Sequence, residues 1–364
     1  MSSSMIGGPF QDLDTPCLVL DLDAAQRNID RMADFFADKP AKLRPHFKNH
    51  KCTELMKRQV VREAAGVTCA KLGEAEVLVG AGFKDILIAN QVVGPHKIKR
   101  LLALLSRAMV RVAVDAEDNC RLLSQMAAAA GAIVGCLIEV NIGMDRCGVE
   151  PGEPAVELAK LIAGLPGLRF DGIQAYEGHM VTLPDPEERR AAVTRDMHKA
   201  LDTADLIETR LGMPVGIVSG GGTGTYDMTG ALEGVDEIQA GTYVTMDCYY
   251  HGVRPEFENA LSVLTTCVSS PSATRAVLDV GVKGVGAEFG VPQVRGREGV
   301  EIPSFRSEEH CILKVTGRPL VVGEKVELIP SHACTTCNLH RELYVCQQGR
   351  VVDVWPIDGS GKLR

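Results

Sequence analysis

The sequence lacks an excess of basic residues and any long apolar run. Its 364 residues include 39 Lys and Arg against 47 Asp and Glu, which gives a formal net charge of −8. Proteins that bind nucleic acid carry basic patches or stripes, so this charge balance argues against nucleic acid as a partner. No apolar stretch is long enough to span a bilayer, which argues against a membrane partner.

The sequence also lacks a recognisable targeting signal near its start. Residues 1–9 contain neither a basic region followed by an apolar run nor an Arg-rich amphipathic helix. The twelve cysteines are scattered, and several of them lie in apolar, strand-like runs. This distribution is typical of reduced thiols packed as small apolar side chains in the cytosol. We therefore expect a cytoplasmic enzyme.

Strand-like apolar runs alternate with amphipathic segments up to about residue 255. Eight strands are predicted, at 42–47, 66–70, 85–90, 109–114, 133–140, 169–175, 215–219 and 237–240. Helices are predicted between them, at 53–65, 74–80, 96–106, 118–130, 155–165 and 187–211. Eight alternations indicate an α/β fold with a parallel (β/α)8 barrel of the TIM type. A doubly wound sheet is the alternative, but no Gly-x-Gly-x-x-Gly opens a helix after the first strand.

The pattern changes after about residue 255, where short strands are separated by Pro, Gly and charged turns. These strands are predicted at 261–268, 274–280, 310–315, 325–330, 343–347 and 350–356. We therefore predict a barrel domain at 23–255 followed by an all-β C-terminal domain at 256–364. The run 15–22 is also strand-like and fits either domain, so residues 1–22 are an alternative part of the second one.

Reactive residues follow the predicted barrel strands, which is where such barrels place their active sites. Lys48 directly follows the first strand, and Lys51 and Lys71 compete with it. A glycine- and threonine-rich loop at 219–225 follows the seventh strand, and residues 241–243 (Gly-Thr-Tyr) follow the eighth. Consecutive glycines let backbone N–H groups surround a phosphate, although a plain tight turn is the alternative.

A lysine that can form a Schiff base, together with a phosphate cradle, is what pyridoxal 5'-phosphate requires. We choose Lys48 for the Schiff base because it ends a strand directly; a solvated surface charge is the alternative reading. Far downstream, His332 and Cys334 offer an imidazole and a thiol, which are soft donors that suit zinc and similar metals. The alternative for Cys334 is a packing thiol. The two segments together predict one composite active site.

These motifs resemble those of fold-type III pyridoxal-phosphate enzymes, in the branch that contains D-threonine aldolase and D-serine dehydratase. The matching stretches are 14–21, 43–51, 146–149, 172–176, 219–224, 239–243, 278–283 and the His332-x-Cys334 segment. They cover nearly the whole chain in the family's order. The resemblance implies an alanine-racemase-like barrel with a β-domain, assembled as a homodimer.

The resemblance also implies residue roles. Lys48 would attach the cofactor, Arg146 would lie near the phenolate oxygen of its ring, and Tyr176 would line the ring. The phosphate would be held by Gly221, Gly222, Thr223, Gly241, Thr242 and Tyr243. His332 and Cys334 would bind a divalent metal beside the β-hydroxyl of the substrate.

The implied substrate is a small D-3-hydroxy amino acid, and two reactions fit it. A D-threonine aldolase would release glycine and acetaldehyde, with His179 or a metal-bound water as the base; a structural role for His179 is equally open. A dehydratase acting on D-serine or D-3-hydroxyaspartate would give a keto acid and ammonia. Many aldolases of this family have aspartate where this chain has Cys334, and the His-x-Cys order resembles zinc-dependent D-serine dehydratases.

The metal is open as well, because a thiolate favours zinc over manganese or magnesium. Glu177 and Asp145 are further acid–base candidates, but loop carboxylates are more often solvated or paired. A racemase is a second possible class, but it would need no metal, so the His332-x-Cys334 segment argues against it. A protein that only carries the cofactor is a third class, but it would lack the β-rich C-terminal part. A structural zinc site would need four ligands, and the sequence offers no convincing fourth.

Overall fold

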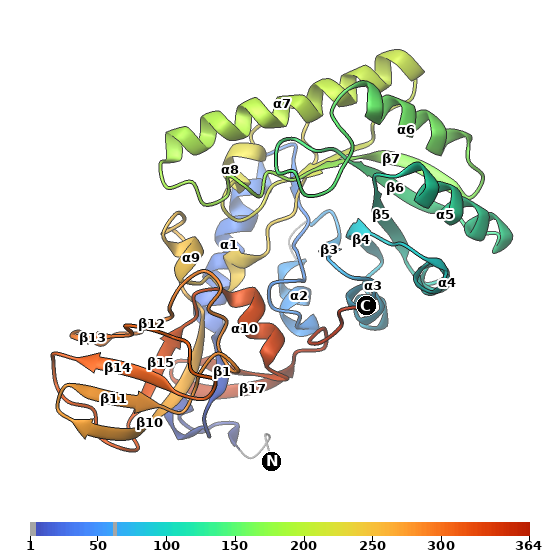
Figure 1. Cartoon of the computed structure of the whole chain (residues 1–364). Helices are drawn as coiled ribbons and strands as arrows, with labels where there is room; N and C mark the ends of the chain where they lie inside the picture. Colours follow the sequence, from blue (N-terminus) through green and yellow to red (C-terminus); the bar gives the residue numbers. More distant parts are fainter. Residues whose placement is uncertain (1–4, 61–63) are drawn as a thin grey trace. The chain divides into compact units, whose positions relative to one another are not determined.

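The computed structural model describes residues 5–60 and 64–364 (Figure 1). The chain divides into two compact units. The first, here called the barrel unit, comprises Met32–Lys48, Met56–Gly241 and Lys362–Arg364. The second, here called the β-unit, comprises the chain up to Arg31, Asn49–Leu55 and Thr242–Gly361.

The barrel unit is built on a parallel sheet of eight strands. In spatial order these are β2 (Lys42–Leu43), β9 (Glu237–Ile238), β8 (Ile217–Gly220), β7 (Leu168–Ala175), β6 (Val134–Glu139), β5 (Met109–Val114), β4 (Asp85–Gln91) and β3 (Val67–Cys69). An isolated parallel bridge between His46 and Thr68 joins the two end strands. Each of the eight predicted strands is present, and the predicted barrel-type fold is confirmed.

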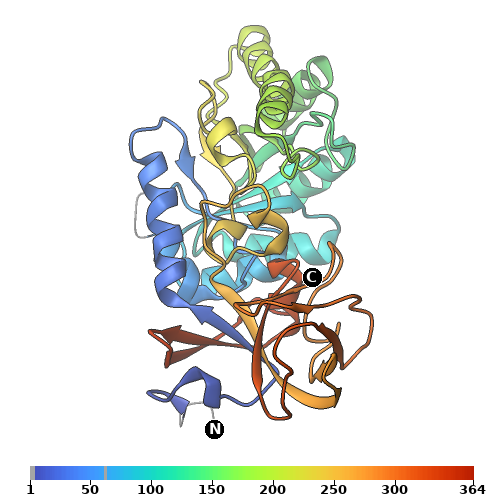
Figure 2. The same cartoon turned by 90° about the vertical axis from the view of Figure 1, so that its left-hand side faces the viewer.

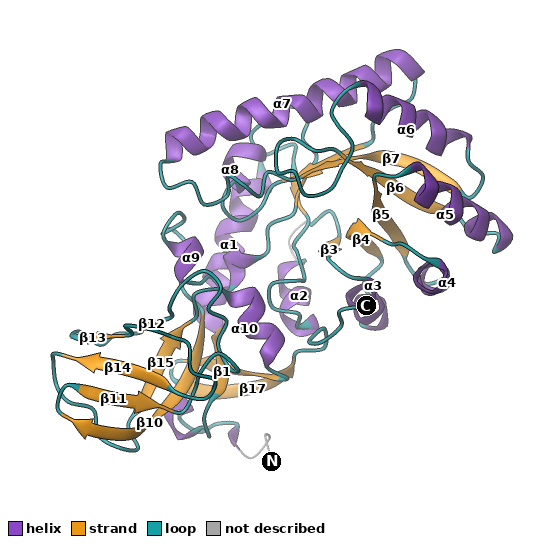
Figure 3. Cartoon of the chain, in the orientation of Figure 1, coloured by secondary structure: helices purple, strands orange, loops and turns teal. Residues whose placement is uncertain are grey.

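Helices separate the strands along the chain (Figure 3). They are α1 (Leu22–Ala37), α2 (Thr53–Gln59), α3 (Leu72–Gly80), α4 (Pro95–Leu104), α5 (Glu117–Ala129), α6 (Glu153–Gly164), α7 (Pro186–Leu211) and α8 (Tyr226–Thr229). The predicted helix at 53–65 ends earlier, at Gln59, and residues 61–63 lie outside the described residues. No helix in the described ranges is both long and apolar enough to cross a membrane.

The long helix α7 shows how local sequence sets the ends of these elements. Asp185 caps it, because its side chain accepts the backbone N–H groups of Glu187 and Glu188. Pro186 occupies the first turn, where its missing N–H costs nothing. Gly212 ends the helix in the left-handed conformation, with φ of 62°.

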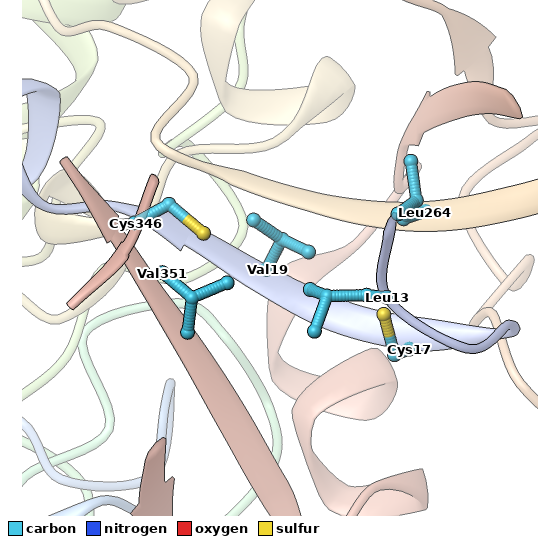
Figure 4. Close-up of a cluster of buried hydrophobic side chains, with 6 residues drawn as sticks. All are labelled: Leu13, Cys17, Val19, Leu264, Cys346 and Val351. Atoms are coloured by element: carbon cyan, nitrogen blue, oxygen red, sulfur yellow. The ribbon is translucent and has the colours of Figure 1, made fainter. Parts of the chain in front are cut away.

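The β-unit contains the remaining strands. They are β1 (Cys17–Asp21), β10 (Leu261–Ser272), β11 (Arg275–Leu278), β12 (Gln293–Val294), β13 (Val300–Glu301), β14 (Cys311–Val315), β15 (Lys325–Ile329), β16 (Glu342–Gln347) and β17 (Arg350–Pro356). Strand β1 pairs antiparallel with β10 and parallel with β16, so the run predicted at 15–22 belongs to this sheet (Figure 2). Its inner face packs a cluster of apolar side chains (Figure 4). They are Leu13, Cys17, Val19, Leu264, Cys346 and Val351.

One part of the sequence prediction is wrong for this region. The C-terminal part is mostly β rather than all-β, because helix α10 (Ala333–Leu339) interrupts the strands. The buried carboxylate of Asp247 accepts the N–H of Ala333 and so stabilises the start of this helix. Helix α9 (Cys248–His251) directly follows Asp247. All twelve cysteines are free thiols, as predicted.

The seam between the end strands of the barrel sheet is held by Arg44. This side chain is only 1% exposed, and it binds the carboxylate of Glu237 through Nε and Nη2 at 2.7 and 2.6 Å. Across the seam, Nη1 donates to Asp85 at 2.8 Å and Nη2 donates to the carbonyl of Ala65 at 3.0 Å. Burial would lower the pKa of Arg44, but the two carboxylates outweigh it and raise the pKa. Arg44 therefore ties β2 to both neighbours.

Replacing Arg44 by Leu should destabilise the barrel unit, because it leaves the Glu237 carboxylate buried without its cation. We expect a loss of about 3–5 kcal/mol in the free energy of unfolding, measured by urea denaturation. The control is Arg121→Leu, which removes the exposed Arg121–Glu117 pair and should cost less than about 1 kcal/mol. Equal losses in the two variants would contradict the role given to Arg44.

Candidate active site

Lys48, Arg146 and Tyr176 lie close together in the barrel unit. The Nζ atom of Lys48 is 5.7 Å from the centre of the Tyr176 ring, and Cζ of Arg146 is 5.3 Å from it. Arg146 and Tyr176 follow the carboxyl ends of β6 and β7, the side of a barrel where active sites lie. The structure thus brings together the three residues predicted to bind the cofactor ring.

Lys48 is the best placed of the three candidate lysines. Its N–H lies 3.3 Å from Nδ1 of His46, and His46 bridges to Thr68 at the barrel seam. Lys51 belongs to the other unit and has a left-handed backbone, with φ of 54°. Lys71 precedes the first turn of α3. The ammonium group of Lys48 lies over the Tyr176 ring.

A buried polar row lies beside Arg146. Glu139, Gln174 and Ser219 are register partners across β6, β7 and β8, and Gln174 donates to the Glu139 carboxylate. The other carboxylate oxygen of Glu139 is 3.8 Å from Nη2 of Arg146. Burial raises the pKa of Glu139 to about 7, against the opposing effects of Gln174 and Arg146. Glu139 therefore forms a long ion pair with the Arg146 guanidinium.

The glycine-rich loop after β8 is compact and internally bonded. The N–H of Gly221 donates to Glu177, and the N–H of Gly222 donates to the Thr225 hydroxyl. Gly224 has no room for a side chain, because a Cβ there would lie 1.8 Å from the carbonyl oxygen of Val181. The loop is therefore rigidly packed. The predicted role of Gly221, Gly222 and Thr223 in phosphate binding stays a prediction.

The second predicted phosphate segment, Gly241-Thr242-Tyr243, follows β9. Gly241 ends the barrel unit, whereas Thr242 and Tyr243 lie in a short 3-10 turn of the β-unit. The Tyr243 ring is fully buried, with its centre 5.9 Å from that of Phe257. The role of these three residues likewise stays a prediction.

His179 is paired with an ionised carboxylate. Its Nε2 atom is 3.5 Å from Oδ2 of Asp196, on helix α7. Burial would raise the pKa of Asp196, but hydrogen bonds from Arg195 and Lys199 outweigh it and lower the pKa to about 2. An imidazole beside a fixed anion is suited to accept a proton. This pairing is compatible with the predicted role of His179 as the base, and equally with a purely structural role.

The predicted metal segment lies at the start of α10, in the β-unit. Nδ1 of His332 is 2.5 Å from the Glu288 carboxylate, and Sγ of Cys334 accepts a hydrogen bond from the Asn49 amide at 3.6 Å. Burial would lower the pKa of His332, but the neighbouring Cys334 and Glu288 raise it to about 9. Asn49 is itself fixed by the Thr245 hydroxyl at 2.8 Å.

This donor set fits a divalent metal held at an open site. A metal-binding histidine usually gives its second ring N–H to a carboxylate, which is the relation between His332 and Glu288. Imidazole and thiolate together suit zinc. Within the described ranges, no group of three His, Cys, Asp or Glu side chains is arranged to hold a metal. His332 and Cys334 would supply two ligands to such a metal.

Sequence reasoning missed several of these partners. Glu139, Asp196 and Glu288 each fix a predicted residue, yet they lie between 7 and 44 positions away from it in the sequence. Phe289 was also missed; its ring stacks on Tyr249 at 4.4 Å and lies 4.7 Å from the His332 ring. No motif spacing marks such contacts, because only the fold brings the partners together.

The chain matches two known domain families. Residues 20–248 match the alanine racemase N-terminal domain, and residues 260–346 match a putative serine dehydratase domain. The 3-hydroxy-D-aspartate aldolase of Paracoccus denitrificans (strain Pd 1222) is 37% identical over 362 residues, which covers 96% of this chain and 93% of that protein. The chain belongs to the D-threonine aldolase and D-serine dehydratase family. It is therefore an enzyme of the lyase class.

Other members of this family have the same fold. The D-threonine aldolase of Arthrobacter sp. is 37% identical, with 98% of this chain and 95% of that protein covered. The crystal structure of D-threonine aldolase from Filomicrobium marinum matches with a TM-score of 0.96 and 38% identity over 99% of each chain. D-threo-3-hydroxyaspartate dehydratase from Delftia sp. HT23 matches with a TM-score of 0.84 and 28% identity, over 96% of this chain and 98% of that chain.

In the cofactor-free protein, Glu139→Gln should change how stability depends on pH. The Glu139 pKa is raised from 4.5 to about 7, so the folded state binds more protons than the unfolded state between these values. The wild-type fold then loses stability as pH rises through this window, whereas Gln does not titrate. From about pH 5 to pH 8, the variant should gain roughly 1–3 kcal/mol relative to wild type.

Denaturant unfolding at several pH values measures this change. Glu157→Gln, at an exposed position on α6, is the matched control and should follow the wild-type pH dependence. If the free energy of unfolding depends on pH in the same way for wild type and Glu139→Gln, the raised pKa of Glu139 is contradicted.

Proposed function

We propose that this enzyme is a lyase, dependent on pyridoxal phosphate and a divalent metal, that cleaves D-3-hydroxy amino acids. D-threonine would give glycine and acetaldehyde. The observation that carries this proposal is the grouping of Lys48 and Arg146 around Tyr176 at the carboxyl ends of the barrel strands. Relatives named as aldolases, at 37% identity over nearly the full length, support it.

The residues of the barrel unit would hold the cofactor. Pyridoxal phosphate, when bound, withdraws electrons from the carbon that carries the substrate's amino group. Lys48 would attach it covalently, and Tyr176 would line its ring. The Arg146 guanidinium, anchored by Glu139, would stabilise negative charge beside it. His179, oriented by Asp196, would take the proton of the substrate hydroxyl.

The residues at the start of α10 would hold the metal. A divalent ion there would act as a Lewis acid toward the β-oxygen of the substrate. His332 supplies an imidazole that Glu288 orients, and Cys334 supplies a thiolate that the Asn49 amide stabilises. We propose zinc or manganese, with magnesium as a further alternative. We also propose a homodimer in the cytoplasm, with the barrel at 23–255 as the cofactor-binding domain and 256–364 as the domain with the metal segment.

A dehydratase is the second candidate, and Cys334 favours it. A thiolate beside His332 suits zinc, and D-threo-3-hydroxyaspartate dehydratase from Delftia sp. (strain HT23) is 30% identical over 354 residues. The same residues would then convert D-serine or D-3-hydroxyaspartate into a keto acid and ammonia, because the water lost from the β-carbon is taken up again in hydrolysis of the imine product. Both reactions need a held β-oxygen and differ in which bond to the β-carbon breaks.

Product analysis separates the two. The purified protein, supplied with pyridoxal phosphate and either zinc or manganese, is given D-threonine and D-serine separately, with the L-amino acids as controls. Glycine and acetaldehyde from D-threonine, with little pyruvate from D-serine, are expected. Pyruvate and ammonia from D-serine, without glycine from D-threonine, would make the enzyme a dehydratase. No reaction with either would contradict the assignment of D-threonine and D-serine as substrates.

Glu288→Ala should weaken metal binding without removing a ligand. Loss of the carboxylate that orients a metal-binding histidine typically lowers metal affinity about 10–100-fold. The measurement is zinc affinity by competition with a chelator. The control, Glu301→Ala, removes an exposed carboxylate of the same unit and should leave the affinity unchanged. Unchanged zinc affinity in Glu288→Ala would argue against His332 as a ligand.

A further inference from the structure

Glu177 is a fully buried carboxylate that the proposed reaction does not use. It directly follows Tyr176 in the loop after β7. A buried charge is costly unless hydrogen bonds compensate for it, so its partners indicate what it does. Hydrogen bonds to its carboxylate come from the glycine-rich loop and from α8, which follows that loop.

The contacts form a small network under the loop. Oε2 of Glu177 accepts the N–H of Gly221 at 3.1 Å, and Oε1 accepts the hydroxyls of Thr225 and Thr229 at 2.7 and 2.5 Å. The Thr225 hydroxyl also accepts the N–H of Gly222 at 3.2 Å. Two successive backbone N–H groups are thus directed at the carboxylate, one directly and one through a single hydroxyl.

The loop is also confined by its neighbours. A Cβ at Gly221, where φ is +72°, would lie 2.9 Å from the Ile238 side chain. The Val181 carbonyl excludes any side chain at Gly224. The backbone of the glycine-rich loop is therefore confined to one packed conformation, and Glu177 fixes the first half of the loop by hydrogen bonds.

We propose that Glu177 is a positioning residue that holds the glycine-rich loop in the conformation that receives the cofactor's phosphate group. This inference rests on the proposed function, because it assigns the loop to pyridoxal phosphate. Glu177 does not act on the substrate itself, since its carboxylate is buried and directed at Gly221, Thr225 and Thr229. Its effect is on how strongly the protein distinguishes pyridoxal phosphate from pyridoxal, which lacks the phosphate.

The test compares the binding of these two compounds by absorbance titration. Glu177→Ala removes the whole network, and Thr225→Val keeps the side-chain shape while removing the link to Gly222. We expect affinity for pyridoxal phosphate to fall roughly tenfold or more in both, as for lost hydrogen bonds to a buried charge, with affinity for pyridoxal unchanged. Glu177→Gln should retain much of the wild-type preference, because one amide oxygen can accept from Gly221 while its NH2 group donates to both threonines.

Thr203→Val is the matched control. It removes a buried threonine hydroxyl on α7 that bonds the Lys199 carbonyl and the Gly152 N–H, away from the loop, and should keep the wild-type preference. An unchanged preference in Glu177→Ala and Thr225→Val would overturn the inference, and so would equal losses for both compounds. If wild type binds neither compound, the proposed function itself fails. Thermal unfolding of each variant identifies loss of fold; should Glu177→Ala unfold, Thr225→Val alone decides the outcome.

Discussion

The buried ion pair between Arg44 and Glu237 is the interaction on which the barrel unit depends. Within the described residues, β2 and β3 do not pair as a ladder, and the isolated bridge from His46 to Thr68 joins the two ends of the sheet. Arg44 reaches β9 on one side and the segment leading into β3 on the other. Lys48 lies four residues further along the same strand end. The closure of the sheet and the position of the proposed cofactor lysine are therefore consequences of one short segment.

Carboxylates lie beside three of the side chains that carry the proposed chemistry. Glu139 lies beside Arg146, Asp196 beside His179 and Glu288 beside His332. In each pair, the acidic residue is either more deeply buried than the residue it contacts or comes from a different element. Pre-orientation of this kind reduces the rearrangement needed when substrate binds. A carboxylate thus orients functional side chains in both the barrel unit and the β-unit, although the architectures of the two units differ.

The sequence predicted the architecture better than the details of the site. All eight barrel strands were found because parallel strands buried on both faces read as short apolar runs. Helix α10 was missed, since its seven residues are too few to show helical periodicity. Lys48 could be chosen from its place after a strand, whereas the roles of Arg146 and Tyr176 followed from the resemblance to the family. Glu177 was considered a solvated or catalytic carboxylate, because nothing near it in the sequence reveals its partners at Gly221, Thr225 and Thr229.

The proposed site depends above all on Lys48 as the residue that attaches the cofactor. The most direct measurement is to load the protein with pyridoxal phosphate, reduce the imine linkage with borohydride, digest the protein and locate the modified lysine by mass spectrometry. We expect a single pyridoxyl-phosphate modification, on Lys48. Modification of Lys51 or Lys71 instead, or the absence of any stable linkage, would contradict it.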